Sequence, residues 1–256
     1  MQIHDIAKSL LQDFDNRRPG ASFTHLNLEL NIDQAYDLQF AIASMRKQRG
    51  EKIIGYKIGC TSAAVQRQMG ITHPVFGHVW DSETYESGCK LALSLFDHLA
   101  IEGELAVTLG EDIPSSSFLL EHPEAICDIK PVIELHNKVF YATEDKRACE
   151  LIANNAIHAG FITGDVTERT DNFENPKLQI LIDGKVVATC EGSQLIEPIQ
   201  SSLQWLQTTL EATDGQLQEG QIILTGSIPS LIPIDQRCSV KITAPPFGET
   251  NATFLD

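Results

Sequence analysis

Residues 101–107 read IEGELAV and set two carboxylates two positions apart inside a segment with the composition of a buried strand. Side chains alternate between the faces of a β-strand, so Glu102 and Glu104 share one face and the residues between them share the other. Such a pair is also typical of a solvated strand face. Residues 129–135 (IKPVIEL) add Glu134 at the end of a second apolar run. Three carboxylates on two strands suit a hard divalent cation such as Mg2+ or Mn2+.

A lysine stands in the middle of another apolar segment, residues 53–61 (IIGYKIGCT). Lysine is rarely buried without a partner, so Lys57 must form an ion pair, extend its amine to solvent or take part in chemistry. The Thr61-Ser62 pair that follows is typical of a helix N-terminus, and Gly70 is a natural end for that helix.

Composition favours one soluble domain, residues 1–256, because no Pro-, Ser- or Gly-rich linker divides the chain. No apolar run of about 18 residues is available to span a bilayer. The first 14 residues, MQIHDIAKSLLQDF, form an amphipathic pattern that contains acids and is unlike a signal peptide. The six cysteines are scattered without C-x-x-C spacing, as in a reducing compartment. We therefore predict a cytoplasmic protein.

The formal net charge of -16 argues against nucleic acid and against anionic membrane surfaces as partners. A protein this acidic that binds an anionic small molecule must concentrate positive charge locally. A divalent cation together with Lys57 would provide that charge.

Hydrophobic periodicity predicts helices first and then many strands with single helices between them. The predicted helices are 3–14, 33–49, 61–69, 118–127, 143–155 and 194–210. The predicted strands are the Lys57 segment within 53–61, 91–95, 102–109, 129–135, a hairpin over 178–189 that turns at Asp183-Gly184, 220–225, 240–243 and 251–255, with 73–85 as a loop. Without regular βαβ repetition, this order favours an α+β fold.

Several segments in order resemble the 2-keto-4-pentenoate hydratase group of the fumarylacetoacetate hydrolase superfamily, which also contains the 4-oxalocrotonate decarboxylases. They are GYKIGCTS (55–62), QRQMGI (66–71), HPVFGHVWDS (73–82), IEGELAV, PVIEL (131–135) and GQIILTGSIP (220–229). The resemblance implies a fumarylacetoacetase C-terminal-like fold over 51–256, a mixed β-roll or flattened barrel with helices outside and the site at its mouth. Residues 1–50 would form a helical segment packed on it, and the family implies a homo-oligomer.

The resemblance also implies a chemistry. Glu102, Glu104 and Glu134 would hold Mg2+ or Mn2+, which a short 2-oxo or 2-hydroxydienoic acid chelates through its carboxylate and C2 oxygen. Lys57 and Asp81 would transfer protons, Asp81 on the strength of the resemblance alone. The implied activity is metal-dependent hydration of a 2-hydroxydienoate or 2-oxo-4-enoate in the meta-cleavage catabolism of aromatic compounds.

The chain departs from the family pattern in its second half. Glu197 stands where the hydratases usually have the histidine of Gly-His-Pro, Asn154 where they have an acid, and Arg237 where they have the aspartate of Gly-Asp. Two alternatives therefore stay open. One is decarboxylation of a 2-oxo diacid, with Arg67 or Arg237 as the contact for its distal carboxylate. The other is a metal-binding homologue that has lost catalysis and serves as a structural subunit.

Overall fold

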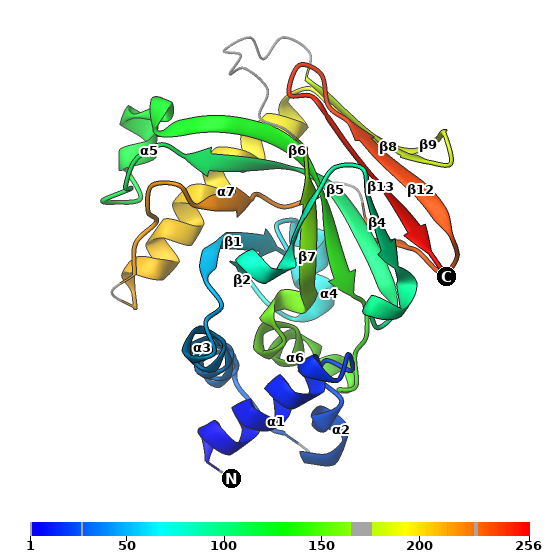
Figure 1. The fold of residues 1–256 in the computed structure, drawn as a ribbon. Coiled ribbons are helices and arrows are strands. Elements are labelled where there is room, and N and C mark those ends of the chain that lie inside the picture. Colours follow the sequence, from blue (N-terminus) through cyan, green and yellow to red (C-terminus); the bar gives the residue numbers. More distant parts are fainter. Residues whose placement is uncertain (1, 27, 165–175, 214, 228–229) are drawn as a thin grey trace.

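The computed structural model describes residues 2–26, 28–164, 176–213, 215–227 and 230–256. Two β-sheets form its body, and α1, α2, α3 and α6 lie together at the end that carries the N-terminus (Figure 1). The α-helices are α1 (Ile3–Asp15), α2 (Ser22–Leu26), α3 (Ile32–Gln48), α4 (Ala63–Met69), α5 (Phe118–Glu121), α6 (Arg147–Ala153) and α7 (Ser193–Glu211). Short 3-10 turns are η1 (Asp81–Glu83), η2 (Leu93–Leu95), η3 (Pro123–Ala125), η4 (Glu144–Lys146) and η5 (Asn155–Ile157). Among the described residues, no helix has the length and apolar character needed to cross a bilayer.

The larger sheet runs in the order β2-β1-β10-β5-β6-β7-β3, with β11 also pairing with β5. Its strands are β1 (Ile53–Gly59), β2 (Val75–Trp80), β3 (Thr84–Glu86), β5 (Leu99–Leu109), β6 (Ile126–Asn137), β7 (His158–Thr163), β10 (Ile222–Leu224) and β11 (Ile232–Pro233). The sheet curls until β2 contacts β7 near the opposite edge. The α+β class and the barrel-like sheet predicted from the sequence are therefore confirmed.

The smaller sheet covers the outer face of the curl, in the order β4-β13-β12-β8-β9. Its strands are β4 (Cys89–Ala92), β8 (Lys177–Ile182), β9 (Lys185–Glu191), β12 (Cys238–Thr243) and β13 (Glu249–Leu255). Helix α7 joins it in the main hydrophobic core. Contact between the sheets is so close that a Cβ on Gly103 would lie 2.7 Å from Ile242 Cδ1. This explains the glycine between the two glutamates of IEGELAV.

The inner face of the curl encloses a small apolar cluster from five strands: Val79, Ala106, Val132, Phe161 and Leu224. Strand register places the polar residues of interest on this same face. Lys57 pairs with Leu224, Leu224 with Ala106, and Glu134 with both Glu102 and Phe161. The inner face is therefore apolar in the middle and charged towards one end.

The N-terminal helices share a second core with α6, with Ile71 between α4 and β2, and with Val75 at the start of β2. Helix α3 begins at a capping box, because Asn31 Oδ1 accepts the Gln34 N–H at 2.9 Å and Gln34 Oε1 accepts the Asn31 N–H at 3.0 Å. The predicted helices 3–14 and 33–49 are confirmed to within a residue or two.

Several predicted elements need correction. The predicted loop 73–85 contains β2, whose six residues are all buried, and Pro74 only precedes the strand. The predicted helix 118–127 is cut short after Glu121, since Pro123 starts a 3-10 turn and β6 begins at Ile126. The predicted strand 91–95 ends at Ala92, and the helix predicted over 143–155 is α-helical only in α6, which follows the 3-10 turn η4. Residues 228–229, which end the GQIILTGSIP motif, lie outside the described residues.

Candidate metal centre

The pairing of β5 with β6 brings the predicted acids together. Glu102 lies directly opposite Glu134, and Glu104 lies opposite Val132. Because side chains alternate along a strand, Glu102 and Glu104 share the inner face, as predicted. Glu104 and Glu134 are each 1% exposed, and the side chain of Glu102 is 19% exposed. The solvated-face interpretation of IEGELAV is therefore wrong for this chain.

Lys57 reaches the same cluster from β1, two strands away from β5. Its Nζ lies 3.3 Å from Glu134 Oε1, and the residue is 3% exposed. Burial lowers the pKa of the Lys57 amine, but the charges of Glu134, Glu102 and Glu104 outweigh it, so this pKa is raised above its ordinary value. Lys57 is therefore a buried cation in an ion pair.

Glu134 is the residue that most of the others contact. His158 Nδ1 lies 2.7 Å from its Oε1, and His136 Nε2 lies 3.4 Å from its Oε2. Burial raises the pKa of the Glu134 carboxyl, but His136 and Lys57 outweigh burial and hold this pKa well below its ordinary value. Glu134 is thus ionised and held from two sides.

Glu104 has a different environment from Glu134. Its Oε2 accepts the Gly226 N–H at 2.5 Å, while its Oε1 is buried without a hydrogen-bond partner among the described residues. Burial and the neighbouring negative charge of Glu134 raise the pKa of the Glu104 carboxyl well above its ordinary value. Gly226 has φ +100°, and a Cβ there would lie 2.6 Å from Thr61 Cγ2, so only glycine offers its amide to Glu104 at this point.

His136 joins the predicted acids, although it was not among the predicted site residues. One donor atom each from Glu102, Glu134 and His136 lie within 4.8 Å of one another, close enough for a single cation to contact all three. His136 follows Glu134 by two residues on β6, so the alternation that grouped Glu102 with Glu104 also places His136 beside Glu134. Glu104 lies outside this group of three.

His158 was also missed, and sequence spacing could not have found it. It opens β7 and is aligned with His136 across a bulge in the pairing of β6 with β7. The turn before it is left-handed at three residues that are not glycine: Asn155, Ala156 and Ile157 have φ of 55°, 53° and 56°. Such a turn is strained and persists only where its surroundings hold it.

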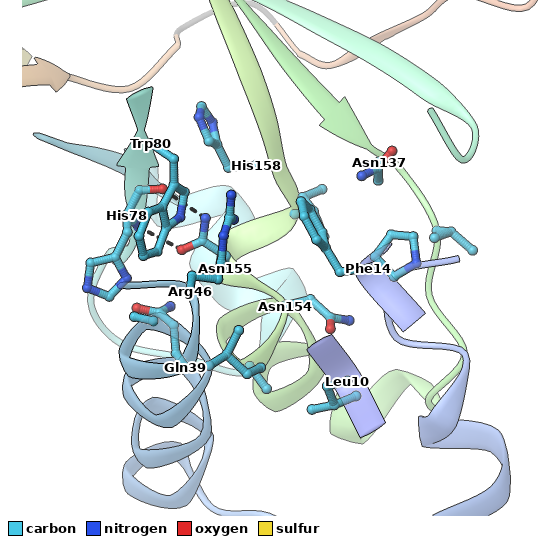
Figure 2. Close-up of a pocket in the computed structure, with 16 residues that line it drawn as sticks. Leu10, Phe14, Gln39, Arg46, His78, Trp80, Asn137, Asn154, Asn155 and His158 are labelled. Carbon is cyan, nitrogen blue, oxygen red and sulfur yellow. Dashed lines mark hydrogen bonds between the residues drawn. The ribbon is translucent and has the colours of Figure 1, made fainter. Parts of the chain in front are cut away.

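Asn155 holds that turn against β2. Its Oδ1 accepts the His78 N–H at 2.7 Å, and its Nδ2 donates to the His78 carbonyl at 2.8 Å. A cavity between α1, α3, β2 and the turn lies beside these groups, and His158 is part of its wall (Figure 2). Residues of the N-terminal helices α1 and α3 therefore line the same cavity as Asn155 and His158.

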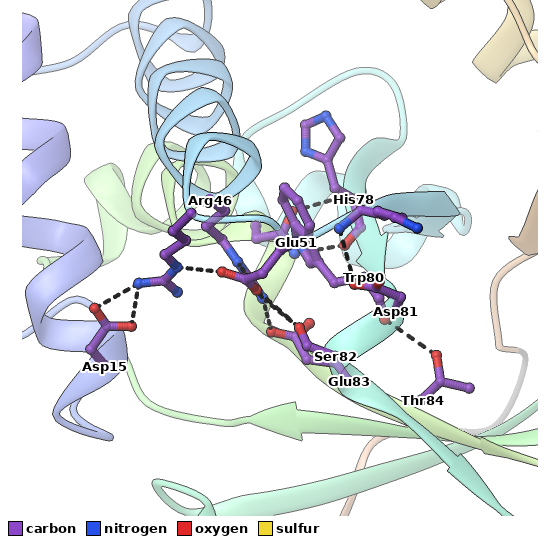
Figure 3. A network of polar contacts seen from close by, with 12 residues as sticks. Asp15, Arg46, Glu51, His78, Trp80, Asp81, Ser82, Glu83 and Thr84 are labelled. Carbon is purple, nitrogen blue, oxygen red and sulfur yellow. Dashed lines mark hydrogen bonds and ion pairs between the residues drawn. The ribbon is translucent and has the colours of Figure 1, made fainter.

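The structure does not bring Asp81 to the cluster, which corrects the expectation that it shares a site with Lys57. Asp81 is exposed beyond the far end of β2, where its Oδ1 accepts the Lys52 N–H at 3.0 Å (Figure 3). Lys52 and Lys57 are five positions apart along extended chain, about 16 Å. Arg67 and Arg237, the candidates for a distal carboxylate, are both exposed.

Comparison with known proteins agrees with this architecture. The model of the fumarylacetoacetate (FAA) hydrolase C-terminal family matches residues 61–254. The 2-keto-4-pentenoate hydratase of Paraburkholderia xenovorans (strain LB400) is 24% identical over 239 residues, which cover 91% of this chain and 87% of that protein. The 4-oxalocrotonate decarboxylase of Pseudomonas putida is 25% identical over 230 residues, covering 89% and 87%.

The fold is shared with a solved enzyme. The 4-oxalocrotonate decarboxylase from Pseudomonas putida G7, complexed with magnesium and adipate, superposes with a TM-score of 0.86 at 23% identity and covers 99% of this chain and 97% of that one. At this identity the likeness establishes the fold, while relatives of both reaction types leave the choice between hydration and decarboxylation open.

Proposed function

Because the chain belongs to the fumarylacetoacetate hydrolase family, we propose that it is a metal-dependent hydro-lyase that adds water to a short 2-hydroxydienoate or 2-oxo-4-enoate. The observation that carries this proposal is the buried group of Glu102, Glu134 and His136 with Lys57 beside it. A buried group of like charges with a strongly shifted carboxyl pKa is typical of a functional site. Related hydratases support the choice of reaction.

The residues present fit a divalent cation. We propose that Glu102, Glu104 and Glu134 hold it, and that the unpartnered Oε1 of Glu104 turns towards it. Carboxylate oxygens are the donors that Mg2+ and Mn2+ prefer. When bound, the ion supplies Lewis-acid stabilisation of negative charge at the substrate's C2 oxygen.

The residues around the acids then have separate tasks. The Lys57 amine, a cation on the wall of the cluster, offsets the charge of the substrate carboxylate and carries the proton exchanged between water and a substrate carbon, C3 or C5. His158 is a positioning residue, since its contact fixes the orientation of the Glu134 carboxylate. Exposed Asp81 has no part in this scheme.

A second candidate reaction, decarboxylation of a 2-oxo diacid, is favoured by the close superposition on a decarboxylase. Both reactions leave negative charge on the same oxygen, so one cluster can serve either. One assay separates them: purified protein with Mg2+ or Mn2+ is given 2-hydroxypenta-2,4-dienoate, or a 2-oxo diacid, while dienol absorbance and released CO2 are followed. Loss of the dienol without CO2 supports the hydratase, and CO2 from the diacid supports the decarboxylase. If neither dienol loss nor CO2 release is observed, the result supports the alternative of a structural subunit without catalysis.

The proposal includes a homo-oligomer in the cytoplasm, as the family resemblance implies. Light scattering on the purified protein tests the assembly. A monomeric mass at assay concentrations would contradict it.

A further inference from the structure

The imidazole of His136 points at two carboxylates from two different strands. Its Nε2 lies 3.3 Å from Glu102 Oε2 and 3.4 Å from Glu134 Oε2. The side chain is 2% exposed, and among the described residues Nε2 has these two ion-pair contacts but no hydrogen bond of proper geometry, while Nδ1 has no hydrogen-bond partner. A buried polar atom in this state is rare and calls for a physical explanation.

The spacing of these atoms is that of neighbouring ligands on one ion. Two donors at right angles, each about 2.1 Å from a cation, are about 3.0 Å apart. The separations of 3.3 and 3.4 Å exceed this by a few tenths of an ångström, which side-chain adjustment can close. Hydrogen bonds of ordinary length would require shorter separations and better alignment.

The geometry points to His136 as a ligand of the divalent ion, so that the site combines oxygen with nitrogen and selects Mn2+, Fe2+ or Co2+ over Mg2+. This inference rests on the metal-dependent function proposed above. Imidazole suits first-row transition ions, whereas Mg2+ prefers oxygen alone. A site of glutamates alone would show no such preference.

The ligand count is compatible with the proposed substrate. Glu102, Glu104, Glu134 and His136 together leave about two positions on an octahedral ion. A 2-oxo acid that chelates through its carboxylate and its C2 oxygen needs two. Lys57 would remain the cation nearest to the substrate.

The second histidine offers a matched control. His158 binds Glu134 through Oε1, whereas His136 faces Oε2 of the same carboxylate. His158 lies outside the group of three donors. The two imidazoles therefore touch the same glutamate, but only one of them faces the ion.

The test measures bound Mn2+ directly and needs no turnover. Wild-type protein, His136→Gln and His158→Asn are loaded with Mn2+, and electron spin echo envelope modulation records nitrogen coupling to the ion. Wild type and His158→Asn are expected to show coupling that shifts with isotope-labelled histidine, and His136→Gln is expected to lose it. Equilibrium dialysis should show Mn2+ affinity falling about tenfold or more in His136→Gln while Mg2+ affinity changes little.

The outcomes separate this inference from the proposed function. Mn2+ bound by wild type without nitrogen coupling would overturn the role of His136 and leave the metal-dependent function standing. Coupling that persists in His136→Gln and vanishes in His158→Asn would assign the nitrogen to His158. That result would also overturn the role of His136. Failure of wild type to bind Mn2+ or Mg2+ at all would overturn the proposed function itself. If His136→Gln fails to fold, a wild-type spectrum without nitrogen coupling still overturns the inference, and coupling that survives in His158→Asn still supports it.

Discussion

Charge balance around Glu134 dominates the site at the scale of single residues. Three glutamates crowd one end of the inner face, and Lys57 is a cation already committed to one of them. Taking carboxylates out of water is costly unless opposite charge compensates them. Burial and the charge of Glu134 raise the pKa of the Glu104 carboxyl, which lowers this cost by favouring its neutral form. A bound divalent ion would compensate the ionised carboxylates more completely.

Lys57→Met tests the proton-transfer role. Loss of a general acid or base should lower kcat about a hundredfold or more. Metal affinity should stay within a fewfold or rise, because a cation that competes for Glu134 is gone. Steady-state kinetics and Mn2+ titration measure the two effects, with Lys52→Met as the control at an exposed lysine. If kcat stays within a fewfold of wild type, Lys57 is only a counter-charge.

At the scale of elements, β2 and the left-handed turn η5 support the cluster from behind. The carboxamide of Asn155 accepts from and donates to the backbone of His78, as a neighbouring strand would do at the free edge of β2. The same turn leads directly into His158. Backbone strain is therefore located one residue from a side chain that contacts Glu134.

Asn155→Ala should destabilise the fold by about 2–4 kcal/mol, because two buried backbone groups of His78 lose their partners and alanine resists φ near +55°. Urea unfolding measures the change, with Asn154→Ala as the neighbouring control, expected to cost under about 1 kcal/mol. Equal losses from both variants would contradict the role given to Asn155.

The ring of His78 makes stability depend on pH. Burial lowers its pKa to about 4, assisted by the charges of Lys47 and Arg46. The folded state therefore keeps the ring neutral while the unfolded chain, with a pKa near 6.5, takes up a proton. The contribution of His78 to the unfolding free energy is fully present above about pH 6.5 and is lost as the pH falls towards 4.

Proton uptake by His78 should lower the unfolding free energy by about 2 kcal/mol between about pH 7 and pH 5. Urea unfolding at the two pH values should show a smaller difference in His78→Gln than in wild type, while His73→Gln, at an exposed position, keeps the wild-type difference. An unchanged difference in His78→Gln would assign the pH dependence to other groups.

Elements that depend on local pattern could be predicted, and those that depend on distant contacts could not. The amphipathic helices, the Asp183-Gly184 hairpin and the strands of Glu102 and Glu134 carry their signals in their own residues. Strand β2 contains Gly77 and directly follows Pro74, so its segment has the composition of a loop. Strand β7 follows a turn with positive φ at Ala156 and Ile157, residue types that disfavour it. The position of Asp81 could not be predicted for the same reason. The residues around it do not show whether it lies near Lys57 or beyond the other end of the strand.

At the scale of the whole molecule, one buried arginine joins the N-terminal helices to the curled sheet. Arg46 of α3 forms ion pairs with Glu51 and, at 2.6 Å, with Glu83 of η1 (Figure 3). Its guanidinium lies 4.2 Å from the centre of the Trp80 ring on β2 and 4.7 Å from that of Phe14 on α1. Elements from three parts of the chain thus meet at a single charge that is 4% exposed.

Arg46→Met is expected to cost about 3–5 kcal/mol of unfolding free energy, because it leaves the buried Glu83 carboxylate without its cation. Arg49→Met is the matched control at the C-cap of the same helix, since Arg49 also pairs with Glu51 but is exposed, as is its other partner, Asp15. That exposed pair should be worth under about 1 kcal/mol.

Adding Glu83→Gln to Arg46→Met should recover part of the loss, because the unpaired charge is removed. Urea unfolding measures all three variants. Similar costs for Arg46→Met and Arg49→Met, or no recovery in the double variant, would mean that the helices are held on the sheet by apolar packing alone.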